Sequence, residues 1–213
     1  MRVAVVAPSP VPLRAGGAER LWTGLVDHLS QAGHVVELVK LPVREYTLPD
    51  LVAGYRQFAR LDLSHVDLVI SGKYPAWMVE HPNHVVYMLH PLRGLYDRYP
   101  AEHLVDERIP SHPALDRVRQ LAEGSVLDPH LEELQSELRL AVADLGSDHD
   151  AFAVPGPLAR TVVHFLDRVA LDPRRIRRHL AISGQVAERP GYFPPDVRVQ
   201  VVYPPAGLDP GPS

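Results

Sequence analysis

The chain has 213 residues, of which 46% are hydrophobic, and a formal net charge of −4. This length suits one large domain, and the modest charge argues against a nucleic-acid partner. The absence of cysteine excludes disulfides, thiolate catalysis and cysteine–zinc sites. No apolar run approaches the roughly 20 residues of a membrane helix, and no signal-peptide pattern is present. We therefore expect a cytoplasmic protein.

The chain opens with a strand, a glycine loop, a helix and a second strand. Val3–Ala7 is short, apolar and β-branched, which predicts a buried strand. Three prolines and Gly16–Gly17 precede a helix that begins near Ala18 and ends at the C-cap Gly33. The apolar stripe of this helix consists of Leu21, Trp22, Leu25, Val26, Leu29 and Ala32. With a strand at Val35–Leu41, this is the opening unit of a doubly wound α/β sheet.

The glycine loop favours an anionic ligand. Glycines allow a close approach of the backbone, and the following helix directs free N–H groups and its positive dipole end to the same place. A tight turn without a ligand remains an equal alternative. The motif G-x-G-x-x-G is absent, and Lys40 stands where a dinucleotide fold would place an acidic residue, so an NAD or FAD site is disfavoured.

Two further strands would deliver charged side chains to the same edge of the sheet. A helix at Thr47–Arg60 leads to a strand at Val66–Ile70, and Lys73 follows in the loop. The next strand, Val85–Leu89, ends at His90, with Arg93 just beyond. A histidine there can donate a hydrogen bond or exchange a proton near neutral pH. An ordinary surface lysine and a loop histidine are the structural alternatives.

The region from Gly94 to Asp172 predicts helices. An N-cap at Asp128 precedes a leucine repeat over residues 131–145, and Pro157 begins another apolar stripe. These two helices are expected to form a hairpin packed on the sheet. Asp148-His149-Asp150 between them spells D-x-D, a signature that can hold a metal, but a solvated loop is the favoured interpretation and no metal site is expected.

The last part of the chain predicts a basic turn and two more strands. Arg174, Arg175, Arg177 and Arg178 form a local basic patch, which could meet anionic lipid headgroups at a membrane or remain a solvated helix end. His179–Ser183 predicts a strand, with Ser183 capping the next helix, and Val197–Val202 predicts another.

Both ends of the sequence resemble the N-terminal domain of retaining GT-B glycosyltransferases of family 4. The matching residues are Gly16, Gly17, Ala18, Glu19, Arg20, Gly33 and His34, followed near the C-terminus by the strand AIS and the segment VVYPP. The resemblance implies a Rossmann-like, mostly parallel sheet over residues 1–203 with an inserted helical hairpin. It also implies that residues 204–213 begin a linker to a second, donor-binding domain that this chain lacks.

The resemblance further implies a role for each candidate residue. Gly16 and Gly17 would approach the donor phosphate and sugar, and His90 would be the catalytic residue that contacts the sugar or acceptor. Lys73, Arg93 and Glu19 would lie on the acceptor side. The substrates would be a nucleotide-sugar and a glycan or lipid-linked acceptor. No cofactor is expected, because positive charge and helix dipoles would replace a metal at the diphosphate.

Three functions remain open at this point. The chain would be the acceptor-side half of a glycosyltransferase that transfers a hexose once a donor domain on another chain completes it. Alternatively it would be a non-catalytic binding or scaffold subunit, which an exposed apolar flank around Tyr203 would favour, or a fragment of a GT-B epimerase.

Overall fold

The computed structural model describes residues 1–10, 16–102, 109, 111–127 and 130–204. The strands are β1 (Arg2–Pro10), β2 (Val35–Val43), β3 (Leu68–Lys73), β4 (His84–His90), β5 (Arg178–Ala181) and β6 (Val199–Val201). The helices are α1 (Gly17–Gln31), α2 (Leu48–Ala59), α4 (Pro113–Ala122), α5 (Leu131–Leu145), α6 (Pro157–Ala170) and α7 (Gly184–Ala187), with 3-10 turns η1 (Ala76–Met78), η2 (Arg93–Leu95) and η3 (Asp150–Phe152).

The strands form one six-stranded sheet in the order β2-β1-β3-β4-β5-β6, and every pair of neighbours is parallel. This arrangement confirms the expected Rossmann-like, doubly wound α/β fold. The strand order reverses direction at β1, because the chain first steps from β1 to β2 and then crosses back to β3. In open sheets of this kind, ligands bind outside the carboxyl ends of the strands at such a reversal.

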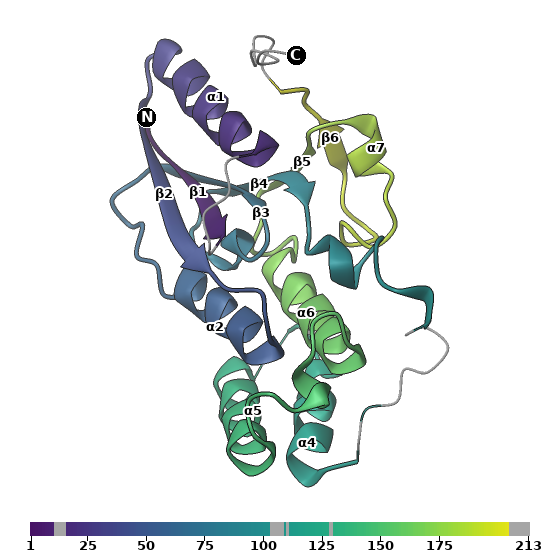
Figure 1. Cartoon of the computed structure of the whole chain (residues 1–213). Helices are drawn as coiled ribbons and strands as arrows, with labels where there is room; N and C mark the ends of the chain where they lie inside the picture. Colours follow the sequence, from purple (N-terminus) through teal and green to yellow (C-terminus); the bar gives the residue numbers. More distant parts are fainter. Residues whose placement is uncertain (11–15, 103–108, 110, 128–129, 205–213) are drawn as a thin grey trace.

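Helices cover both faces of the sheet, with α1 on the side opposite to α2 and α6 (Figure 1). The face under α1 has a small apolar cluster that includes Val3, Val5, Leu21 and Trp22. The opposite face carries the larger cluster, in which α2, η1 and α6 contact one another. The strands buried between these layers therefore carry nearly continuous apolar sequences, as parallel strands do.

The inserted helical hairpin is present, but its members differ from those expected. The helix over residues 131–145 pairs chiefly with α4, a helix that the leucine repeat did not predict. The helix that begins at Pro157 instead packs on α2, η1 and α4. The reason is that nine of the fourteen residues of α6 are buried, so the helix needs neighbours on several sides. Figure 1 shows α4 and α5 extending away from the sheet.

The local predictions are largely confirmed, with shifts at the ends of elements. Ser183 caps α7 through its side-chain oxygen, as expected, and Thr47, the expected first residue of its helix, caps α2 in the same way. Gly33 has the positive φ of +84° that favours glycine after a helix. Strand β3 runs on to Lys73, which the sequence placed in a loop. The predicted cap at Asp128 lies outside the described residues. Within the described part of the chain, no helix is long and apolar enough to cross a membrane.

Candidate functional site

The candidate site lies at the carboxyl edge of β1, β3 and β4. The loop after β1 returns to begin α1 at Gly17, and β3 and β4 end at Lys73 and His90. Because β1 lies beside β3 and β3 beside β4, the structure brings these three chain segments to one edge of the sheet. The edge includes the point where the strand order reverses.

The N-terminus of α1 is open on the side of its first turn. Gly16 is the N-cap residue in extended conformation, and it has no side chain that could accept a hydrogen bond from the first turn. A Cβ added at Gly16 or at Gly17 would meet nothing within 4 Å in the described structure. The packing of the described residues therefore does not require glycine at these positions. The free N–H groups of the first turn and the helix dipole favour an anion there.

A close contact fixes this helix against the end of β3. Trp22, one turn into α1, is 1% exposed and lies over Gly72. A Cβ on Gly72 would lie only 2.5 Å from the Trp22 ring and 2.3 Å from the Tyr87 carbonyl oxygen. Gly72 thus allows α1 to lie directly over β3, one residue before Lys73.

Lys73 and His90 are register partners across β3 and β4. His90 Nδ1 lies 2.7 Å from the carbonyl oxygen of Pro91, so its Nδ1–H donates there and Nε2 is left as an acceptor. Burial lowers the pKa of His90, and the charges of Lys73 and Arg93 lower it further. The imidazole is therefore neutral at pH 7. The Lys73 ammonium group has no hydrogen bond or ion pair with any residue that the structure describes.

Arg93 is held by a carboxylate. Its guanidinium donates to both oxygens of Asp97, with an Nη2 to Oδ2 distance of 2.5 Å. Asp97 also accepts from Arg189 at 3.0 Å and from the Tyr192 hydroxyl at 2.9 Å. These donors, Arg93 first, lower the pKa of Asp97 to about 2. The cluster joins the segment after β4 to the segment after α7 and presents Arg93 beside His90.

Glu19 lies apart from this group. Its carboxylate forms an ion pair with Lys40 of β2, with both side chains about a quarter exposed. Lys40 is the register partner of Ala7, on the side of β1 away from β3. Lys73, His90 and Arg93 therefore come together, whereas the structure engages Glu19 in an ion pair with β2.

The other sequence candidates lie elsewhere. Asp148 and Asp150 are exposed between α5 and α6, and no group of three His, Asp or Glu side chains in the described residues could hold a metal. The basic patch lies at the amino end of β5, and its members mostly have partners. Arg174 pairs with Asp172, Arg175 with Glu80, and Arg177 donates to Asn83.

The sequence analysis missed a buried acid, Asp167. This residue of α6 is 2% exposed and accepts from the Trp77 indole at 2.8 Å, from the Tyr96 hydroxyl at 2.6 Å and from the Tyr55 hydroxyl. Burial raises its pKa to about 6, although the three hydrogen bonds oppose that shift. Its position four residues after Val163, on the apolar side of α6, was the available signal.

No family model, curated protein or solved structure matches this chain. The site is therefore interpreted from its own chemistry. An open helix N-terminus can hold an anion, a neutral imidazole can accept or donate one hydrogen bond, and Lys73 adds a positive charge beside it. Such a group could bind a phosphorylated or otherwise anionic substrate and orient one hydroxyl against His90.

Proposed function

We propose that this chain is the acceptor-side half of a retaining, nucleotide-sugar-dependent glycosyltransferase. In this proposal a donor-binding domain faces the carboxyl edge of the sheet, and a hexose passes from the nucleotide-sugar to a glycan or lipid-linked acceptor. The chain by itself binds acceptor weakly and turns over little, because both walls of the cleft are needed to exclude water and align the reactants.

One observation carries the proposal: the open N-terminus of α1 and the Lys73–His90 pair share the edge where the strand order reverses. The space at Gly16 and Gly17 suits a diphosphate or sugar lying against the backbone. The neutral His90 suits a hydrogen bond to a sugar hydroxyl, since its Nε2 is left as an acceptor. Arg93 and Lys73 add positive charge for an anionic acceptor. The proposal also includes contact of Arg178, at the start of β5, with a membrane.

The test is a sugar-transfer assay across several radiolabelled nucleotide-sugars, with the chain alone and with any protein that co-purifies from its source. We expect transfer only with the partner. Gly17→Val should then reduce the rate by about 100-fold, because it displaces the phosphate from the helix N-terminus. His90→Gln should reduce it by about tenfold or more, the worth of one hydrogen bond.

The matched control is Gly184→Val, which places the same side chain at the first position of α7. A Cβ on Gly184 also meets nothing within 4 Å. Equal loss from Gly184→Val and Gly17→Val, or full activity of Gly17→Val, would refute the assignment of the loop. Transfer by the isolated chain at the rate of the complex would refute the acceptor-half proposal.

A second function, a non-catalytic binding subunit, is favoured by the apolar end of β6. Val201, Val202 and Tyr203 are 36%, 38% and 72% exposed. In this alternative the same donor-binding partner would still co-purify, but His90→Gln would leave the activity of the complex unchanged. The two functions are separated by that one variant.

A further inference from the structure

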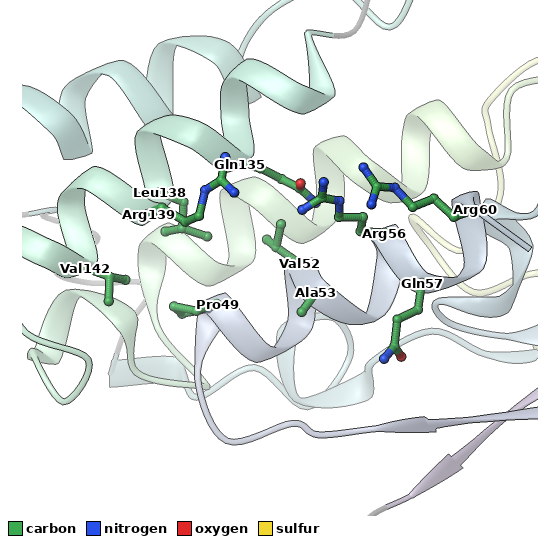
Figure 2. Close-up of a pocket in the computed structure, with 10 residues that line it drawn as sticks. All are labelled: Pro49, Val52, Ala53, Arg56, Gln57, Arg60, Gln135, Leu138, Arg139 and Val142. Atoms are coloured by element: carbon green, nitrogen blue, oxygen red, sulfur yellow. The ribbon is translucent and has the colours of Figure 1, made fainter.

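A groove between α2 and α5 lies apart from the carboxyl edge of the sheet. It has a volume of about 410 Å³, within the range of roughly 300–1,000 Å³ typical of small-molecule sites. The residues that line it, shown in Figure 2, are Pro49, Val52, Ala53, Arg56, Gln57, Arg60, Gln135, Leu138, Arg139 and Val142. They recur at three and four positions along both helices, so the two facing stripes form the walls.

The groove changes from apolar to cationic along its length. Both Arg56 and Arg60, near the end of α2, approach Glu132 at the start of α5, at 3.6 and 3.5 Å. The two helices therefore run in opposite directions. The other end of the groove must then bring Pro49 together with Val142, and its lining there is apolar except for Arg139, which lies beside Leu138 (Figure 2).

The positive charge of the groove is incompletely balanced. Three arginines and no carboxylate line the groove. Glu132 serves both Arg56 and Arg60, and its side chain is 72% exposed. In the described structure, Arg56 Nε and Gln135 Oε1 are buried and have no hydrogen-bond partner. An anion with hydrogen-bonding capacity would compete with Glu132 for the terminal nitrogens of both arginines.

A second cavity continues the groove inward. It has a volume of about 240 Å³ and shares Val52, Arg56, Arg60 and Gln135 with the first. Apolar side chains of η1, α5 and α6 form much of its wall, namely Met78, Leu131, Leu134 and Leu166. Glu80 and Glu132 also line this cavity, so it offers apolar space beside the arginines together with two carboxylates. A hydrocarbon chain can bury its surface there while its charged end stays at the guanidinium groups.

We propose that this groove binds a single-chain anionic amphiphile, a hydrocarbon chain that carries one phosphate or carboxylate group. The head group lies at Arg56 and Arg60, and the chain extends along Val52 and Leu138 toward Val142. The proposal does not rest on the glycosyltransferase function, because none of these residues lies at the carboxyl edge of the sheet.

The experiment is calorimetric titration of the full chain with decyl phosphate, below the concentration at which it forms micelles. Inorganic phosphate and the uncharged decyl maltoside are titrated in parallel. We expect saturable 1:1 binding of decyl phosphate and no measurable binding of the other two. Equal binding of decyl maltoside, or of inorganic phosphate, would overturn the proposal, as would binding to anionic vesicles without binding to the monomeric probe.

Four variants locate the binding. Ala53→Trp fills the groove from an exposed position and should abolish binding. Arg60→Gln should weaken it by about two- to fivefold, whereas Arg178→Gln, an equal loss of charge at a residue that lines neither of these two cavities, should not change it. Glu132→Gln should tighten it by a similar factor, because it removes the competing carboxylate. Unchanged affinity in Ala53→Trp, with native circular dichroism, would overturn the proposal.

Discussion

Trp22 and Gly72 lie so close together that the Cβ of any other residue at position 72 would be 2.5 Å from the indole ring. This contact joins α1 to the end of β3. It therefore sets where the N-terminus of α1 stands relative to Lys73, the next residue of the strand. The geometry of the candidate site therefore depends on a glycine that lies outside the Gly16–Arg20 segment.

Gly72→Ala should lower the free energy of unfolding by at least about 2 kcal/mol, as overpacking of a rigid core does. A shorter side chain at Trp22 should not rescue it, because the Tyr87 carbonyl oxygen, a backbone atom, is nearer still, at 2.3 Å. Urea denaturation provides the measurement. Gly17→Ala is the control: its Cβ meets open space in the first turn of a helix, so its stability should rise by between zero and about 1 kcal/mol. Equal effects of the two substitutions would contradict the packing argument.

His90 should titrate below pH 6.5, because burial, Lys73 and Arg93 all disfavour its charged form. Ring-proton NMR across pH 4–8 measures this pKa directly. Lys73→Met should raise it, since the substitution removes one of the positive charges. Lys40→Met removes the same charge at the ion pair with Glu19 and should leave the pKa of His90 unchanged. A wild-type pKa above 6.5 would contradict the arrangement at the site.

Asp97 should stabilise the fold over most of the pH range. Its folded-state pKa of about 2 lies below the usual value of 3.8, so its contribution is present above about pH 4 and is lost as the pH falls toward 2. Asp97→Asn should cost about 1 kcal/mol at pH 7, a figure discounted for partial exposure. Denaturation at pH 7 and pH 2 should give a difference between wild type and variant that nearly vanishes at the lower pH. A pH-independent difference would exclude the ion pair as its source.

Asp167 should change the pH dependence of stability in the opposite direction to Asp97. Its folded-state pKa of about 6 exceeds the usual 3.8, so the folded state binds the proton more tightly and stability falls as the pH rises from about 4 to 6. The fall is of the order of 3 kcal/mol. Asp167→Asn should remove this pH dependence of stability. The control Asp144→Asn, at an exposed position, should preserve it. Persistence of the slope in Asp167→Asn would assign it to another group.

Asp167→Ala should be more harmful than Asp167→Asn. It leaves the indole of Trp77 and the hydroxyls of Tyr55 and Tyr96 without their acceptor, and each unsatisfied buried donor costs roughly 1–3 kcal/mol. Thermal unfolding of the two variants at pH 7 compares them. Equal midpoints would show that the network contributes little to stability.

The sequence by itself determined the order of elements, most helix starts and the carboxyl-edge location of Lys73 and His90. These follow from local rules: apolar runs of strand length, stripes at the helical period, a cap at Ser183, and a glycine at position 33. Because β strands in such a unit are parallel, residues at strand ends share one edge whatever their distance along the chain.

Only the tertiary structure decided which side chains meet. The partner of α5, the ion pair that engages Glu19, the acceptor role of Asp167 and the groove between α2 and α5 all depend on contacts between segments far apart in sequence. Hydrophobic periodicity tells which face of a helix is buried but not which neighbour buries it, since apolar attraction has no direction. The choice comes from how the shapes of α2, α4, α5 and α6 fit together, and packing at the density of a solid leaves few alternatives once the sheet is in place.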